Sequence, residues 1–146
     1  MRINTRFPMA IHILSLLVLA KEEECTSEMI ARSVNTNSVV IRRINAMLKK
    51  ANIIKVRSGV GGAFLNRLPR EITLLDIYNA VKSPEDISLF DLHHNPNEKC
   101  PVGANIHVAL SEPLLEAQMN LEKTLSTYTL FDVANKIAEK NGVVIE

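Results

Sequence analysis

The sequence predicts a mainly helical fold that contains one small β-hairpin. Three observations support this prediction. Two short helical segments joined by a tight turn are followed by a glycine-rich hairpin over residues 53–65, and a segment after residue 103 carries apolar residues every three or four positions. A helix-turn-helix followed by a hairpin is a winged helix-turn-helix arrangement. We therefore expect a winged helix-turn-helix head and a long C-terminal helix.

Length and composition exclude several classes of protein. The 146 residues suffice for about one domain, and a hydrophobic content of 47% allows a buried core. Two cysteines are too few for a disulfide-stabilised scaffold. The apolar run Met9–Ala20 is shorter than the ~20 residues of a membrane span, and its periodicity favours a buried helix over a signal peptide. We expect a cytoplasmic protein with no membrane partner.

Positive charge is concentrated in one block of the chain. Between Arg32 and Arg70 there are nine basic residues and no Asp or Glu, although the net charge of the whole chain is +1. Solvated surfaces usually mix both signs of charge. A block of this purity is therefore typical of a protein that binds a polyanion.

Capping residues delimit the first three helices. The first helix is expected over about Thr5–Ala20. The second begins at Thr26 or Ser27, either of which can cap it, and ends just before Asn35, which is suited to the left-handed conformation. Asn37 then caps the third helix, which runs to about residue 51.

The third helix has two distinguishable faces. Apolar residues at i, i+4 and i+7 should point inward, and these are Val40, Ile44, Met47, Leu48 and Ala51. The opposite face would present Ser38, Val39, Arg42, Asn45 and Lys49. Ser38, Arg42 and Asn45 are the candidates for base edges, because arginine can pair with guanine and asparagine with adenine. Contact with phosphate or water is the alternative for each residue.

The hairpin follows directly after this helix. Residues 53–57 alternate apolar and basic side chains, residues 58–62 form a glycine-rich turn, and residues 63–65 resume a strand. Arg57 is a candidate for a minor groove, whose narrow walls concentrate negative potential. Ser58 and Gly61 at the tip can approach the DNA, although a tight turn without contact is the alternative, above all for Gly59. The cations assigned to phosphates are Arg43, Lys49, Lys50 and Lys55.

The second half of the chain alternates capped helices with a loop. A capping signature at Thr73–Asp76 begins a fourth helix, and Thr129–Asp132 repeats that signature at the last one. Between them the long helix, with a kink or restart at Pro113, carries a stripe of Leu110, Leu114, Ala117, Leu121, Leu125 and Tyr128. Such a stripe predicts a homodimer contact or packing within its own domain. We assign residues 1–82 to the head, 83–103 to a connecting and sensor loop, and 104–146 to the dimerisation and C-terminal helices.

Two segments resemble those of a known family. Residues 57–64 (RSGVGGAF) and 72–76 (ITLLD) resemble the R-G-P-G-G-G-Y wing and the I-T-L-x-D helix start of the bacterial Rrf2 regulators, which include IscR, NsrR and CymR. The resemblance covers nearly the whole chain, and residues 97–103 (NEKCPVG) are most similar to the YwnA-type branch. It implies a homodimeric transcription regulator, usually a repressor, on an imperfect palindromic operator in double-stranded DNA. The third helix would enter the major groove and the wing the adjacent minor groove.

The sequence also departs from that family. Its iron–sulfur members carry three cysteines before the long helix, whereas this loop has only Cys100, so we expect no cluster and no other cofactor. Arg42 stands where the iron–sulfur branch often has Glu, which predicts a different operator. The wing is about one residue longer than the family pattern.

Several functions are compatible with the remaining residues. Cys100 is the candidate sensor thiol for oxidation or another stress signal, and an inert cysteine is the alternative. A metal site of His93, His94, Cys100 and His107 would lack any standard spacing. An enzyme has no triad, carboxylate pair or nucleotide motif to support it. The sequence is also compatible with a ligand- or metal-responsive regulator and with a DNA-binding module that has no sensing role.

Overall fold

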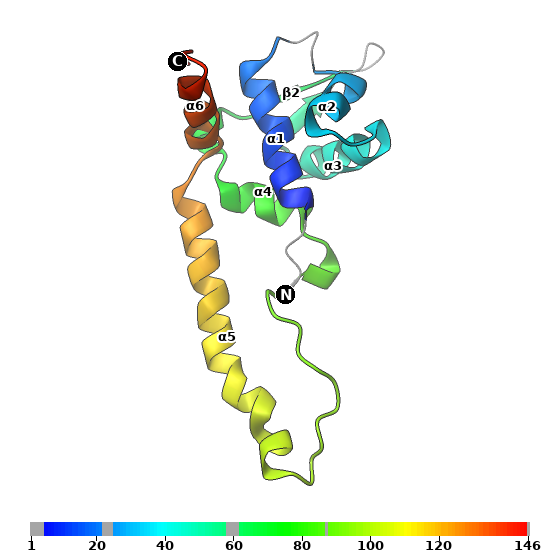
Figure 1. Cartoon of the computed structure of the whole chain (residues 1–146), viewed down its shortest axis with the longest axis vertical. Coiled ribbons are helices and arrows are strands. Elements are labelled where there is room, and N and C mark those ends of the chain that lie inside the picture. The colour runs from blue at the N-terminus through cyan, green and yellow to red at the C-terminus, as the bar shows by residue number, and fades with distance from the viewer. Residues whose placement is uncertain (1–4, 22–24, 58–61, 87, 146) are drawn as a thin grey trace.

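A helical head and a long arm make up the molecule (Figure 1). The computed structural model describes residues 5–21, 25–57, 62–86 and 88–145. Its elements are α1 (Arg6–Leu19), α2 (Ser27–Val34), α3 (Ser38–Lys50), β1 (Ile54–Val56), β2 (Ala63–Leu65), α4 (Leu74–Val81), α5 (Pro101–Thr127) and α6 (Leu130–Lys140), with 3-10 turns at Pro69–Glu71 and Pro84–Asp86. The prediction of a mainly helical fold with one small hairpin is confirmed.

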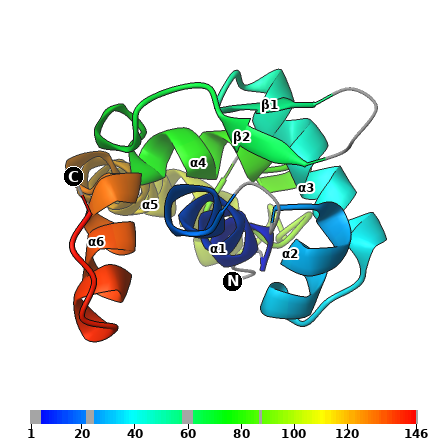
Figure 2. The same cartoon turned by 90° about the horizontal axis from the view of Figure 1, so that it is seen from above.

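Helix α1 is the centre of the head. It contacts α2, α3, α4 and α6, which surround it in the view from above (Figure 2). Ala10, Ile13 and Leu14 of α1 are fully buried in a core that also includes Ile30 of α2 and Ile77 of α4. The apolar run near the N-terminus is therefore a core helix. Among the described residues, no helix is long and apolar enough to cross a membrane.

The caps predicted for α2 and α3 are confirmed. The Thr26 hydroxyl accepts a hydrogen bond from the backbone N–H of Met29 at 3.3 Å, and Asn37 Oδ1 accepts one from that of Val40 at 3.0 Å. Between them, Asn35 ends α2 in the left-handed region with φ 64°. These three residues produce the tight turn that places α3 across α2.

Strands β1 and β2 form the predicted antiparallel hairpin. Lys55 pairs with Phe64, and Val56 pairs with Ala63. Ala63 is buried against the core, while Lys55 and Phe64 are exposed. The tip over residues 58–61, which includes the predicted contacts Ser58 and Gly61, lies outside the described residues.

The arm consists of a loop that leads away from the head and of helix α5, which returns to it (Figure 1). The Leu89 N–H donates to Gln118 Oε1 at 3.3 Å, and His107 Nε2 donates to the His93 carbonyl at 3.0 Å, so both bonds attach the loop to α5. Helix α5 begins at Pro101, earlier than predicted, and continues through Pro113 without a restart. At ~1.5 Å per residue its 27 residues span about 40 Å.

Helix α6 packs with the head, although the sequence led us to group it with the long helix. Thr73 and Thr129 form an isolated antiparallel bridge, and the Leu130 N–H donates to the Ile72 carbonyl at 2.8 Å. Leu130 is fully buried in the core of the head. Both predicted capping boxes, at α4 and at α6, are present and lie side by side.

Candidate nucleic-acid interface

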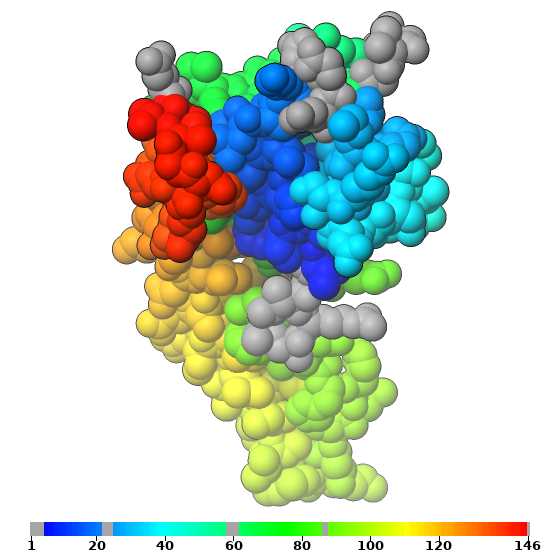
Figure 3. Space-filling model, turned by 45° about the horizontal axis from the view of Figure 1, so that its top comes forward, coloured from blue at the N-terminus to red at the C-terminus, as the bar shows by residue number. Residues whose placement is uncertain are grey.

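The outer face of α3 is exposed along one side of the head (Figures 2 and 3). Its inner face is anchored by Ile41, Ile44 and Leu48, which are all buried. The side chains exposed on the helix are those of Val39, Arg42, Arg43, Ala46, Lys49 and Lys50, and Ser38 is half-buried in the first turn. Cations suit phosphates, a guanidinium suits guanine, and an apolar side chain such as Val39, 51% exposed, suits a thymine methyl group.

Asn45 does not lie on this outer face. Its side chain is only 8% exposed, and its Oδ1 has no hydrogen-bond partner among the described residues. Residue 45 follows Ile41 by four positions and precedes Leu48 by three, which places it on the inner face of a helix. The prediction that Asn45 is exposed to base edges is therefore wrong, and Ala46 occupies the expected position. Ala51, predicted to point inward, is exposed, and the buried residue that the sequence reading missed is Ile41.

Arg42 is held by a carboxylate from the neighbouring helix. Its Nη2 donates to Glu28 Oε1 of α2 at 2.8 Å, and the two side chains are 56% and 59% exposed. The pair connects the two helices of the helix-turn-helix on their solvent side. An exposed pair of this kind contributes ~0–1 kcal/mol to stability, so it orients Arg42 without immobilising it.

The hairpin extends the cationic surface beyond α3. Lys55 of β1 and Arg57, which follows that strand, are both exposed. The guanidinium carbon of Arg57 lies 5.3 Å from the ring centroid of Phe64 on β2, within the range of a cation–π contact. This contact holds Arg57 against the wing directly after the end of β1.

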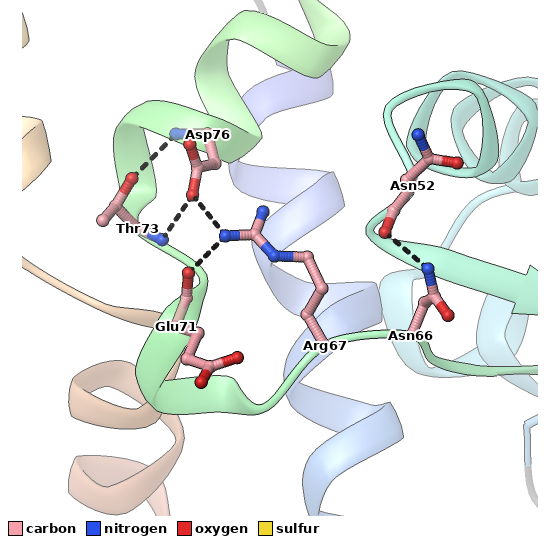
Figure 4. Close-up of polar contacts among 6 residues, drawn as sticks. All are labelled: Asn52, Asn66, Arg67, Glu71, Thr73 and Asp76. Atoms are coloured by element: carbon pink, nitrogen blue, oxygen red, sulfur yellow. Dashed lines mark hydrogen bonds and ion pairs between the residues drawn. The ribbon is translucent and has the colours of Figure 1, made fainter.

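Two arginines of the basic block make contacts within the head. Arg67 Nη2 donates to the Glu71 carbonyl at 2.5 Å and lies 3.4 Å from the Asp76 carboxylate, which also accepts from the Thr73 N–H (Figure 4). The guanidinium carbon of Arg70 lies 3.6 Å from the ring centroid of Phe131 on α6. Asp76 therefore offsets the charge of Arg67, whereas Arg70 stays exposed and cationic beside a neutral ring.

The base of the hairpin is joined to α3 by a side-chain bond. Asn66 Nδ2 donates to the Asn52 carbonyl at 3.0 Å (Figure 4). Asn52 itself takes a left-handed conformation, with φ 60°, in the turn between α3 and β1. The bond holds the wing in one orientation relative to α3, so that both can contact the same ligand.

Cys100 lies at the start of α5, at the end of the arm farthest from the head (Figure 1). Its thiol is exposed, and the backbone N–H groups of Gly103 and Val102 lower the pKa of that thiol from its usual value. Cys25, the other cysteine, is buried in the head.

A tight turn positions this cysteine. The Asn97 carbonyl accepts from the Cys100 N–H at 3.1 Å, and Asn97 Oδ1 accepts from the Lys99 N–H at 3.0 Å. A Cβ added at Gly103 would collide with the backbone oxygen of Asn97. Glycine at position 103 is thus required for the turn to close on the first turn of α5, a role that the sequence reading missed.

The apolar stripe of α5 is only partly covered by its own chain. No described residue of the helix is buried, and the predicted stripe residues are half-exposed apart from Tyr128, which is exposed. Outside the stripe, two further apolar residues of α5 are exposed, Val108 by 76% and Leu115 by 59%. The space-filling view shows the arm projecting beyond the head (Figure 3), although α5 also contacts α4 of the head.

A comparison with protein families matches residues 3–136 to the Rrf2 model, described as an iron-dependent transcriptional regulator. The cysteines of this chain do not fit an iron–sulfur cluster. Clusters are held by several thiolates, whereas one of the two cysteines is buried in the head and the other lies on the arm. Within the described ranges, no group of three or more His, Cys, Asp or Glu residues could hold a metal ion, so a site of His93, His94, Cys100 and His107 finds no support.

Related proteins and structures agree with the family match. YwnA of Bacillus subtilis (strain 168), whose name describes an HTH-type transcriptional regulator, is 48% identical over 92% of this chain and 98% of its own. A crystal structure described as a DNA-binding protein is 44% identical, with a TM-score of 0.74 over 90% of this chain and 100% of the other. CymR of B. subtilis, at 22% identity and a TM-score of 0.66 over 92% and 96% of the two chains, shares the fold. The chain belongs to the Rrf2 family of transcriptional regulators.

Proposed function

We propose that the protein is a cytoplasmic, homodimeric repressor that binds a specific DNA sequence and has no catalytic activity. The observation that carries the proposal is the exposed surface of α3 and β1. It combines four cations, Arg42, Arg43, Lys49 and Lys50, with the exposed Val39, and Lys55 and Arg57 continue it onto the hairpin. A cationic helix of this width fits the major groove of B-DNA.

The proposed contacts divide into two groups. Arg42 and Ser38 would contact base edges, and Val39 a thymine methyl group. Arg43, Lys49, Lys50 and Lys55 would contact phosphates, which position the helix but carry no sequence information. Arg57 would enter the adjacent minor groove, with Ser58 and Gly61 at the wing tip beside it.

Dimerisation would occur through α5. Its stripe from Leu110 to Tyr128 is incompletely covered and lies on an arm directed away from the head. Pairing two such helices around a two-fold axis would cover the stripes and present two copies of α3 to an imperfect palindrome.

Cys100 would couple this dimer to an oxidant. Its exposed thiol with a lowered pKa favours the thiolate, the form that oxidants attack. Because the thiol lies at the start of α5, a polar oxidised sulfur there would change how the paired helices meet and hence the spacing of the two α3 helices. A signal other than oxidation, such as a ligand, is the alternative.

Binding measurements test both parts of the proposal. We would titrate the purified protein against DNA from upstream of its own coding sequence and against random DNA, over a range of salt, with and without a mild thiol oxidant. Tighter binding to the upstream DNA, lost on oxidation, supports a redox repressor. If the wild type and Cys100→Ser both bind the upstream DNA specifically and the oxidant changes neither binding curve, Cys100 is not a sensor of oxidation. Equal binding to the two DNAs contradicts the proposal that the protein is a repressor specific for a sequence in this upstream DNA.

A further inference from the structure

We propose that Glu28 is a specificity-determining residue. Its carboxylate holds the Arg42 guanidinium for a guanine edge and keeps that guanidinium from strengthening binding to phosphates. Glu28 would thus weaken binding to random DNA more than binding to the operator. The inference rests on the proposed role of α3 as the helix that reads DNA.

The geometry leaves Arg42 able to bind both groups at once. The ion pair uses Nη2 of the guanidinium on one carboxylate oxygen at 2.8 Å. A guanidinium has five N–H donors, and a bidentate contact with guanine O6 and N7 needs two. The remaining donors are therefore sufficient for a base while Glu28 stays in place.

Both partners belong to helices that are well anchored. Glu28 lies in the first turn of α2, which Thr26 caps, and Arg42 lies in the second turn of α3. Ile30 of α2 and Ile41 of α3 are fully buried members of the same core. The carboxylate therefore constrains Arg42 from a fixed side, the side of α2.

The position of the negative charge is unusual. From residue 25 to residue 70, Glu28 is the single Asp or Glu in the sequence, within a segment that supplies α2, α3 and the hairpin. A carboxylate at this place repels phosphates and neutralises the nearest arginine. An arginine without such a partner would add to the sequence-independent attraction for DNA.

The alternative is that the pair only stabilises the packing of α2 on α3. Exposed ion pairs usually contribute little to stability, so stability measurements alone would not distinguish the two. The difference lies in the ratio of operator affinity to random-DNA affinity, which a purely structural pair would leave unchanged.

The experiment uses the full-length protein and an operator selected by the wild type from a random DNA pool. Binding to this operator and to random duplex DNA would be measured by fluorescence anisotropy at several salt concentrations. The variants are Glu28→Gln, Arg42→Ala and the double variant. Glu98→Gln is the matched control, because it removes the same charge from an exposed residue of the loop at the far end of the arm. Circular dichroism confirms that each variant is folded.

Glu28→Gln should bind random DNA roughly 2- to 5-fold more tightly, with a salt slope steeper by about one. Operator affinity should stay unchanged or fall, so the specificity ratio decreases. Glu98→Gln should match the wild type. In the Arg42→Ala background, Glu28→Gln should no longer change the ratio, because the coupling between the two residues is lost.

Two results would overturn the proposal in different ways. If Arg42→Ala reduces the ratio but Glu28→Gln raises both affinities equally, Glu28 exerts only a general charge effect and the role of α3 survives. If Arg42→Ala leaves the ratio unchanged, the proposed reading by Arg42 fails together with this inference.

Discussion

The turn that holds Cys100 predicts that an alanine at position 103 destabilises the protein, although the same change stabilises most helices. Gly103 lies in the first turn of α5, and an alanine there would place its Cβ against the Asn97 backbone oxygen. In a helix without neighbours, Gly→Ala stabilises by up to ~1 kcal/mol. The structure predicts the opposite sign for Gly103→Ala.

The magnitude follows from the contacts that must move. Shifting Asn97 away breaks the hydrogen bond from the Cys100 N–H at 3.1 Å and strains the one from the Lys99 N–H at 3.0 Å. Each is worth ~0.5–1.5 kcal/mol net. The clash of the new Cβ adds an overpacking cost of ~1–3 kcal/mol, whereas the higher helix propensity of alanine returns up to ~1 kcal/mol. The free energy of unfolding should therefore fall by about 1–3 kcal/mol.

Urea unfolding at one fixed protein concentration measures this loss, since dimerisation would make stability depend on concentration. Ala104→Gly, at the next residue of the same helix, is the control and should cost no more than ~1 kcal/mol. The rate at which Cys100 reacts with an aromatic disulfide provides a second measurement. It should fall in Gly103→Ala, because the N–H groups that lower the Cys100 pKa move away from the thiol. A Gly103→Ala protein that is more stable than the wild type and equally reactive would refute this account of the turn.

Three further predictions concern the arm and the return to the head. In the wild type, the reaction rate of Cys100 with the disulfide should rise with pH around a midpoint below the ordinary pKa of a cysteine thiol, because the N–H groups of Gly103 and Val102 lower the pKa of Cys100. That midpoint should move upward in urea, because only the folded protein holds the Gly103 and Val102 N–H groups that lower the pKa of Cys100. If the pH profile is the same with and without urea, the start of α5 does not lower this pKa. Leu121→Glu should be a monomer, as measured by light scattering, while its helical content stays that of the wild type. If the variant remains a dimer, α5 is not the interface. Thr129→Ala should lower the free energy of unfolding by ~1 kcal/mol through loss of the cap of α6, and Thr129→Ser should retain most of it; equal losses would show that the cap hydroxyl is unimportant.

Local signals in the sequence predicted most of the fold. The caps at Thr26, Asn37, Thr73 and Thr129 and the left-handed Asn35 act over three or four residues, so the sequence contains all the partners they need. The hairpin strands were predictable for the same reason, since alternation and a glycine-rich turn are local patterns.

Features that depend on distant contacts were not predictable. Asn45 lies three residues after Arg42 and three before Leu48, so helical spacing is compatible with either face of α3, and only the fold shows that it is buried. Arg67 belongs to the basic block of the sequence, but in the fold it is paired with Asp76, which a sequence pattern cannot show. The docking of α6 depends on backbone bonds between residues 72–74 and 128–130, which are far apart in the sequence.

The binding of two variants to operator and random DNA tests the central claim most directly. Arg42→Ala should cost ~1–3 kcal/mol on the operator and little on random DNA, because Arg42 is proposed to contact a base. Lys49→Ala should weaken binding to both DNAs similarly and reduce the salt slope by about one, because Lys49 is proposed to contact a phosphate. If Arg42→Ala instead weakens binding to both DNAs equally, Arg42 is a phosphate contact and the claim that it reads the operator is contradicted.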